Sequence, residues 1–239
     1  MTTVTDTVRE VVLANPAAIR VFEELGIDYC CGGEKPLREA CAASRLSVEV
    51  VLARLEAAPL PQPLQEKDWQ REPLASLVEH IVSTHHAFVR GECPRLLDLL
   101  DKVCSAHGAN HPELDRVRST LEQLAEELKA HLLKEEQILF PYIVAAEQAS
   151  ARGLSAPASC FGTVRTPVRM MMFEHDNAGQ ALRELRRLTN DYALPSDACL
   201  SYRTLYQALP AFETDLHRHI HLENNILFPR AIALEEKGC

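Results

Sequence analysis

Apolar residues recur every three or four positions along four long stretches of the chain. The stretches cover roughly residues 73–107, 111–147, 166–190 and 197–235. Such spacing gathers apolar side chains on one face of an α-helix, whereas a half-buried strand needs a strict alternation that these stretches lack. Short connections between long helices favour antiparallel neighbours. The pattern therefore predicts an all-α fold whose main part is an antiparallel four-helix bundle.

The N-terminal part of the chain has a different pattern. Residues 1–57 read as four short helical segments interrupted by the sequence IDYCCGG, and the Pro-rich residues 58–72 carry no periodicity. Proline-rich segments favour extended, semi-rigid conformations. We therefore expect a small helical domain with a Cys-Cys loop at 1–57, a linker at 58–72, and the bundle at 73–239.

Pro94, Pro141 and Pro229 fall inside the long helical patterns. A proline inside a helix removes one backbone hydrogen bond, and its ring clashes with the preceding turn. We expect a kink or an early helix end at each of them.

Charged side chains interrupt the apolar seam at two related places. The second stretch contains HLLKEEQILFP from His131, and the fourth contains HIHLENNILFP from His219. In each copy the His and the Glu four residues later, Glu135 or Glu223, occupy seam positions that face the bundle core. An unpaired carboxylate buried there would cost on the order of several kcal/mol. We infer that a cation compensates these charges.

Each of these His and Glu pairs lies on one face of its helix, so both side chains can reach one metal centre. The third stretch offers His175 in its seam. The first offers His86, whose apolar stripe is longer than that of the adjacent His85. The separation between His86 and His131 nearly equals that between His175 and His219. We therefore expect two pseudo-symmetric helical hairpins, each contributing one His and one His-x-x-x-Glu.

The candidate metal ligands are thus four imidazoles and two carboxylates. They are His86, His131, Glu135, His175, His219 and Glu223. This set is too large for one tetrahedral zinc, and its nitrogen and oxygen donors suit two octahedral iron or manganese ions. Bridging carboxylates would give each metal four protein donors and leave positions for a shared oxygen species and a small ligand. The alternative is a buried set satisfied by hydrogen bonds alone.

The remaining histidines are assigned to surface or supporting positions. Helix length places His107 about 31 Å from His86, which excludes it from the same site. Glu136 lies one position off the seam and is expected to be solvated. The histidines without a ligand role are His80, His85, His107, His111, His217 and His221.

The composition of the chain argues against two classes of binding partner. The chain of 239 residues has a net charge of -9 and no basic cluster, which argues against nucleic acid and anionic membrane surfaces. Its start, MTTVTDTVREVV, lacks the basic and apolar regions of a signal peptide, and no apolar run reaches membrane-spanning length. We therefore expect a cytoplasmic protein. Its eight Cys show neither zinc-type spacing nor a disulfide framework, so we expect them to be reduced.

The two copies HLLKEEQILFP and HIHLENNILFP resemble the haemerythrin-like domain. Together with IDYCCGG and EKDW they resemble the repair-of-iron-centres family, bacterial di-iron proteins associated with nitrosative and oxidative stress, along nearly the whole chain. The resemblance implies two non-haem Fe ions, carboxylate- and oxo-bridged, on the six positions above. It also implies that residues 1–57 are the ScdA-type domain of that family, with Cys30 and Cys31 as its signature pair.

The resemblance further implies a stress-response protein that supports repair of damaged iron-sulfur clusters by iron donation, by nitric oxide binding or removal, or by both. Its partners would be damaged iron-sulfur proteins or cluster scaffold proteins, with nitric oxide or oxygen as a small ligand, and family members can be homodimers. The alternatives are a nitric oxide reductase-like enzyme, an oxygen or nitric oxide carrier or sensor, and a purely structural bundle. Cys30 and Cys31 could form a redox pair, a nitric oxide target or a partner contact, or Cys30 could simply be a core residue.

Overall fold

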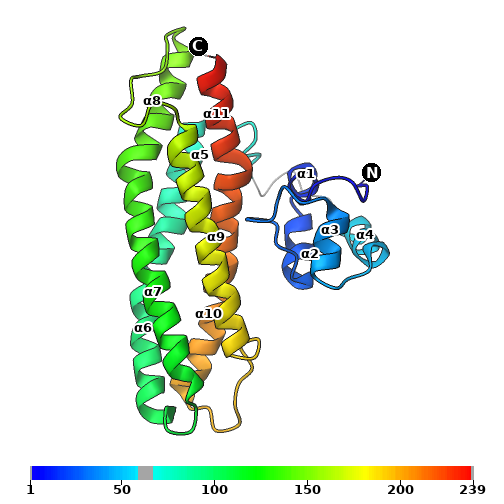
Figure 1. Ribbon diagram of the computed structural model, residues 1–239, viewed down its shortest axis with the longest axis vertical. Helices are drawn as coiled ribbons and strands as arrows, with labels where there is room; N and C mark the ends of the chain where they lie inside the picture. Colours follow the sequence, from blue (N-terminus) through cyan, green and yellow to red (C-terminus); the bar gives the residue numbers. More distant parts are fainter. Residues whose placement is uncertain (1, 59–66, 238–239) are drawn as a thin grey trace.

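The computed structural model describes residues 2–58 and 67–237, and within these ranges the chain contains helices and no β-strand. Four short N-terminal helices lie beside a long bundle (Figure 1). The predicted all-α architecture, a four-helix bundle preceded by a small helical unit, is confirmed. The predicted linker at 58–72 falls partly outside the described residues, at 59–66. None of the described helices has both the length and the apolarity needed to cross a lipid bilayer.

The four N-terminal helices pack around a small apolar core of their own. They are α1 (Val8–Ala14), α2 (Ala18–Leu25), α3 (Leu37–Ala43) and α4 (Val48–Ala57). A capping box starts α1, because the Thr7 side chain accepts from the Glu10 N–H and the Glu10 carboxylate accepts from the Thr7 N–H. Gly26 ends α2 in the left-handed conformation that glycine favours. Phe22 and Leu37 are fully buried between these helices.

The bundle consists of four long rods, three of which contain a short π-helical segment. The rods are α5 (Leu74–His80), η1 (Ile81–His86) and α6 (Ala87–His107); α7 (Glu113–Lys134), η2 (Glu135–Leu139) and α8 (Phe140–Ala151); α9 (Arg165–Leu188); and α10 (Leu200–His221), η3 (Leu222–Leu227) and α11 (Phe228–Lys237). α6 packs against α7 and α10, and α7 packs against α9. These neighbours are antiparallel (Figure 1). Each predicted helical stretch therefore corresponds to one rod.

The apolar core of the bundle is divided into two clusters. One cluster lies between α6, α7, α9 and α10 and includes Leu100, Leu121 and Phe212. The other includes Ile81 and Phe140 and is formed mainly by α5, α8, α11 and the start of α9. Each π-helical segment connects a stretch of one cluster with a stretch of the other. The segments therefore mark the layer where the two clusters meet.

The π-helical turns shift the buried seam of the rods by one position, because each wide turn contains one residue more than an α-turn. In the second rod, regular spacing from Glu135 predicts Ile138 and Tyr142 in the seam. Ile138 is instead 46% exposed, while Leu139 and Ile143 are each 1% exposed. The core of α8 is thus one residue out of register with that of α7.

The prolines at which we expected a kink or an early helix end behave differently from one another. Pro94 lies within α6, which continues to His107, so the expected early end does not occur there. Pro141 and Pro229 each follow directly after the residue at which an α-helix restarts beyond a π-helical segment. Proline fits this position because its missing N–H falls in the first turn of the new helix.

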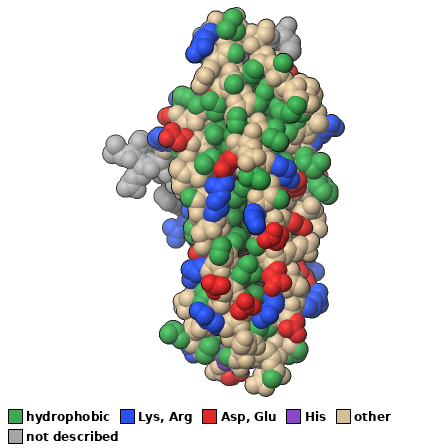
Figure 2. Space-filling model, turned by 90° about the vertical axis from the view of Figure 1, so that its left-hand side faces the viewer, with side chains coloured by type: hydrophobic (Ala, Val, Ile, Leu, Met, Phe, Trp, Pro, Cys, Tyr) green, Lys and Arg blue, Asp and Glu red, His purple; other side chains and the backbone are tan. Residues whose placement is uncertain are grey.

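The face of the bundle shown in Figure 2 carries Lys and Arg interspersed with Asp and Glu over its lower half, whereas hydrophobic side chains are more frequent above. Ion pairs three residues apart on the bundle helices include Glu92 with Arg95 on α6 and Glu126 with Lys129 on α7. Such pairs stabilise a helix by about 0.2–0.5 kcal/mol each, so they add solubility more than stability.

Candidate metal centre

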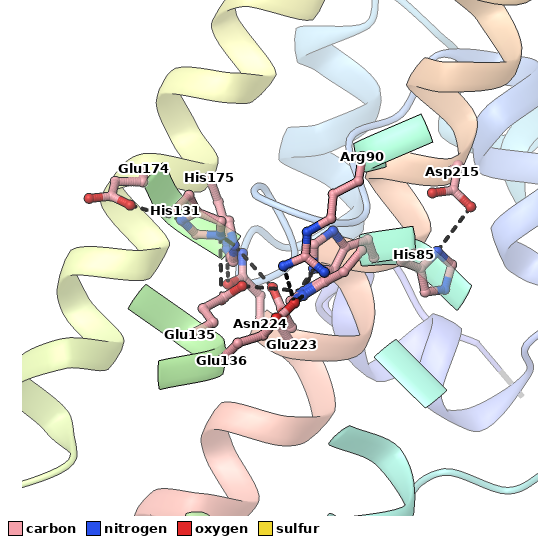
Figure 3. A network of polar contacts seen from close by, with 12 residues as sticks. His85, Arg90, His131, Glu135, Glu136, Glu174, His175, Asp215, Glu223 and Asn224 are labelled. Carbon is pink, nitrogen blue, oxygen red and sulfur yellow. Dashed lines mark hydrogen bonds and ion pairs between the residues drawn. The ribbon is translucent and has the colours of Figure 1, made fainter. Parts of the chain in front are cut away.

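The six predicted metal ligands lie together in the layer between the two apolar clusters (Figure 3). None of them is more than 3% exposed. All four rods contribute: His86 ends η1, His131 and Glu135 lie at the junction of α7 and η2, His175 lies midway along α9, and His219 and Glu223 lie at the junction of α10 and η3.

The six side chains form two overlapping clusters, each with its candidate ligand atoms within 4.8 Å of one another. One cluster contains His86, Glu135, His219 and Glu223, and the other contains His131, Glu135, His175 and Glu223. Both glutamates are therefore shared. Each cluster takes one His from each half of the bundle, so the two helical hairpins interleave and neither holds a complete set alone.

In the first cluster the two imidazoles face each other. The Nε2 atoms of His86 and His219 are 3.2 Å apart. Glu135 Oε2 lies 3.4 Å from His86 Nε2, and Glu223 Oε1 lies 3.0 Å from His219 Nε2. Four donor atoms thus converge on one small space.

The second cluster repeats this arrangement. The Nε2 atoms of His131 and His175 are 3.1 Å apart. Glu135 Oε1 lies 3.4 Å from His131 Nε2, and Glu223 Oε2 lies 3.1 Å from His175 Nε2. Each carboxylate therefore turns one oxygen toward each cluster, as a ligand bridging two cations would.

The outward nitrogen, Nδ1, has a hydrogen-bond acceptor in three of the four imidazoles. The pairs are His86 with Glu136 at 2.6 Å, His131 with Glu174 at 2.8 Å, and His175 with Asn224 at 2.8 Å. An acceptor at Nδ1 keeps the ring proton on that side, so the inward Nε2 presents the lone pair that a metal needs. The chain thus orients its imidazoles for metal binding.

The fourth imidazole, His219, is held differently. Its Nδ1 has no hydrogen-bond partner among the described residues. The adjacent ring of His85 lies nearly parallel to it, with the ring centroids 5.7 Å apart, and His85 Nδ1 lies 2.9 Å from Asp215 Oδ1. His85 therefore packs beside His219 outside the two clusters, and it is buried and not at the surface.

The residues fit a bound cation better than they fit an empty core. Both carboxylate oxygens of Glu135 and Oε2 of Glu223 are buried without a hydrogen bond. In the second cluster the acceptors at Nδ1 of His131 and His175 leave two neutral imidazoles with their Nε2 lone pairs facing each other, which is repulsive unless a metal ion or a proton lies between them. Hydrogen bonds alone therefore do not satisfy this set. Nitrogen and oxygen donors of this kind suit iron or manganese.

The pKa shifts of His131 and Glu135 also indicate that the two buried carboxylates need positive charge beside them. Burial lowers the pKa of His131, but Glu135 and then Glu174 outweigh it and raise that pKa to about 10. Burial and Glu223 act to raise the pKa of Glu135, yet His131 brings it below its usual value. The carboxylates are thus ionised at neutral pH, and without metal a proton on His131 supplies part of the balancing charge.

Glu136 differs from its expected solvated position. Its Oε1 accepts hydrogen bonds from His86 and from Arg90, and only 25% of its side chain is exposed. Glu136 and Asn224 occupy the same place in the two copies of the repeated phrase, directly after Glu135 and Glu223. Aligning the two copies shows that the two positions are equivalent, but their contacts with the imidazoles come from the structure.

The loop between α2 and α3 reaches from the N-terminal unit to this centre (Figure 1). Asn224 Nδ2 donates to the Cys30 carbonyl at 3.3 Å, while its Oδ1 accepts from His175. Asn225 Nδ2 donates to the Tyr29 carbonyl at 2.9 Å. One amide thus connects the Cys loop to a ligand imidazole.

The two thiols of this loop lie close together near the centre. Their Sγ atoms are 3.8 Å apart, and Cys31 Sγ lies 3.5 Å from the His175 carbonyl oxygen. Asp28 Oδ1 fixes the loop by accepting from the backbone N–H groups of Cys30, Cys31 and Gly32. The hydrogen bond with Cys31 and burial raise the pKa of Cys30 well above its usual value. Cys30 is therefore a thiol, and a weak nucleophile, at neutral pH.

Two family models match the chain. The Hemerythrin HHE cation binding domain matches residues 77–231, and ScdA_N, a Domain of Unknown function (DUF542), matches residues 4–59. The Iron-sulfur cluster repair protein YtfE of Escherichia coli O157:H7 is 39% identical over 227 residues, covering 95% of this chain and 96% of the relative.

The proteins of the same name from Escherichia coli O17:K52:H18 (strain UMN026 / ExPEC) and Shigella boydii serotype 4 (strain Sb227) are each 38% identical over the same length and shares. The likeness covers both the N-terminal helices and the bundle. It confirms the resemblance seen in the repeated phrases and the Cys-Cys loop. The chain therefore belongs to the hemerythrin HHE cation-binding family and, along nearly its whole length, to the family of the iron-sulfur cluster repair protein YtfE.

Proposed function

We propose that the six buried side chains bind two non-haem iron ions. His86 and His219 would hold one ion, His131 and His175 the other, and Glu135 and Glu223 would bridge them. The observation that carries this proposal is the sharing of both glutamates, each of which directs one oxygen to each cluster. Membership of a family whose domain binds cations supports it.

We propose that residues 1–57 and 73–239 are separate domains joined by the linker 58–72. In support, the apolar cluster of the first four helices contains only residues from the N-terminal segment. The two clusters of the bundle are built almost entirely from residues beyond the linker.

We propose that the protein supports repair of damaged iron-sulfur clusters under nitrosative or oxidative stress. The relatives are named iron-sulfur cluster repair proteins. Bound iron would supply exchangeable positions for nitric oxide and a source of iron for a damaged cluster. The chain contributes imidazole and carboxylate donors, which hold ferrous iron less tightly than thiolates do. Damaged iron-sulfur proteins or cluster scaffold proteins would be its partners.

Reduction of nitric oxide is a second candidate function, favoured by the position of the two thiols beside His175. In this reading Cys30 and Cys31 form a redox pair that passes electrons to the centre. Because Cys30 is held as a thiol, its oxidation must be accompanied by loss of a proton. Repeated turnover of nitric oxide with an electron donor would distinguish this activity from a single round of binding.

The first test is metal content with Mössbauer spectra of the anaerobically purified full chain and of a Glu135→Gln and Glu223→Gln double variant. We expect two coupled irons per chain in the unchanged protein and loss of both in the double variant. The Glu122→Gln and Glu126→Gln double variant removes two charges from the outer face of α7 and should keep its iron. Zinc that is lost in the Glu135→Gln and Glu223→Gln double variant, or a folded protein without iron, would contradict the di-iron proposal.

The second test concerns repair. An iron-sulfur enzyme inactivated by nitric oxide is incubated with the iron-loaded protein, and recovery of its activity is followed together with the iron that leaves the protein. We expect recovery with the iron-loaded protein and none with the Glu135→Gln and Glu223→Gln variant. Recovery equal to that given by free ferrous iron at the same concentration would argue against a repair role.

A further inference from the structure

A second group of metal-binding side chains lies at the end of the bundle remote from the candidate iron centre. His107 ends α6, His111 lies in the connection to α7, and Asp197 lies in the connection between α9 and α10. Ligand atoms of these three residues lie within 4.8 Å of one another. The 21 residues of α6 separate them from His86 by about 31 Å, so the two groups are independent.

The geometry of His111 resembles that of an oriented metal ligand. Its Nδ1 lies 3.0 Å from Glu113 Oε1, and its Nε2 lies 3.0 and 3.2 Å from the two oxygens of Asp197. A carboxylate at one ring nitrogen commonly fixes an imidazole whose other nitrogen binds a metal. Glu113 therefore plays the part toward His111 that Glu136 plays toward His86.

The His107 imidazole forms no hydrogen bond with the other two side chains of the group. Its Nδ1 lies 3.7 Å from Asp197 Oδ2, which is too long for a hydrogen bond, and its buried Nε2 has no partner. Tyr202, which is 1% exposed, holds both imidazoles edge-on, with ring centroids 5.2 Å from His107 and 5.7 Å from His111. The two rings are thus positioned by packing and not by hydrogen bonds to each other.

The spacing of the three residues suits zinc in particular. Zinc is commonly bound by two His three to five residues apart, and His107 and His111 have this separation. In a tetrahedral zinc site the ligand atoms lie about 3.3–3.5 Å apart, within the range of the distances found here. Two imidazoles beside one carboxylate favour zinc over magnesium or calcium.

We propose that His107, His111 and Asp197 bind one zinc ion. The ion would cross-link the connection between α6 and α7 to the connection between α9 and α10. A water molecule would complete the coordination. The site does not depend on the proposed iron centre or its function. The competing explanation is an ion pair between His111 and Asp197 without any metal, because both residues are partly exposed.

The test is zinc binding by the full, iron-loaded protein, measured by dialysis against zinc buffered with a chelator, with iron and zinc then counted separately. Iron loading first keeps zinc from the candidate iron centre. We expect one zinc per chain with unchanged iron, and a rise in Tm on zinc addition. The variants are His111→Ala and the isosteric Asp197→Asn, and the control is Asp115→Asn, an exposed carboxylate at the same end of the bundle.

Both variants should lose the zinc and the zinc-dependent rise in Tm while keeping their iron and their helical content. The control should keep its zinc, the rise in Tm, its iron and its helical content. Loss of at least tenfold in zinc affinity is expected for His111→Ala. No stoichiometric zinc in the unchanged protein, or equal zinc binding by His111→Ala and the control, would overturn the proposal and leave the ion pair as the explanation.

Discussion

The two residues that follow the shared glutamates perform the same task with different chemistry. Glu136 accepts from the His86 Nδ1 as a carboxylate, whereas Asn224 accepts from the His175 Nδ1 as a neutral amide. A carboxylate makes the imidazole a stronger donor to a metal. The amide also has an NH₂ group, which donates a hydrogen bond to the Cys30 carbonyl oxygen. The repeat is therefore symmetric in position and asymmetric in function.

The first prediction concerns Glu136. Replacing it by Ala removes the acceptor of His86, and loss of such a partner typically lowers metal affinity about 10- to 100-fold. Glu136→Gln keeps an acceptor and should have a smaller effect. Ferrous titrations in competition with a chelator measure the affinity, and Glu122→Ala on the exposed face of α7 serves as the control. Equal affinities in Glu136→Ala and the control would show that His86 does not need this hydrogen bond.

The second prediction compares two glycines. A Cβ at Gly33 would lie 2.8 Å from Asn225 Oδ1, while a Cβ at Gly91 in α6 would meet nothing within 4 Å. Gly33→Ala should therefore destabilise the folded protein by about 1–3 kcal/mol through steric overlap. Gly91→Ala should stabilise it by about 0.5–1 kcal/mol through helix propensity. Urea unfolding of both variants gives the free energies, and a neutral Gly33→Ala would mean that the Cys loop does not pack as described.

The sequence was most informative about single residues where a charge fell in the apolar seam. All six candidate ligands could be identified in this way, since His and Glu are costly there without a partner. Glu136 could not be assigned correctly, because it lies one position off a regular seam. Its contact with His86 depends on the local helix geometry, which hydrophobic periodicity does not report.

At the scale of helices, periodicity located all four rods but not their π-helical turns. A π-turn inserts one residue without changing the overall pattern of apolar residues, so the sequence shows only a helix of uncertain phase. The three turns η1, η2 and η3 occur at the layer that holds the candidate centre. Both their position and the resulting shift of the seam had to come from the structure.

The third prediction tests this shift in the second rod. Leu139 is 1% exposed and Ile138 is 46% exposed, although regular spacing from Glu135 would place Ile138 inside. Leu139→Ala should cost about 2–5 kcal/mol of unfolding free energy, as is usual for a fully buried leucine. Ile138→Ala should stay within about 1 kcal/mol of the unchanged protein, because surface substitutions have small effects. Equal losses in chemical denaturation would show that η2 does not displace the seam.

For the whole molecule, the decisive feature is the contact between the Cys loop and the bundle. Asn225 holds the Tyr29 carbonyl, and Arg218 forms an ion pair with Glu23. These contacts shield Cys30, which is 4% exposed. Residue patterns indicated a Cys loop and a bundle separately. They did not indicate that the two meet, because contacts between segments far apart in the chain leave no periodic signal.

The fourth prediction follows from this shielding. Asn225→Ala removes the hydrogen bond to Tyr29, so the loop should open more often and its thiols should be alkylated faster by iodoacetamide. Mass spectrometry of the peptide containing residues 30 and 31 measures the rate. Gln123→Ala, on the exposed side of α7, should alkylate like the unchanged protein. An unchanged rate in Asn225→Ala would indicate that other contacts are sufficient to hold the loop.

The chain of contacts from His175 through Asn224 to the Cys30 carbonyl also has a thermodynamic consequence. If a metal on His175 steadies Asn224, metal occupancy and loop attachment share a coupling free energy, and such coupling acts equally in both directions. Hydrogen exchange in residues 28–33 should therefore be slower in the iron-loaded than in the chelated protein. By the same reciprocity, a client protein that pulled the Cys loop away from the bundle would lower the metal affinity of the site. The same movement would also uncover the bound ion.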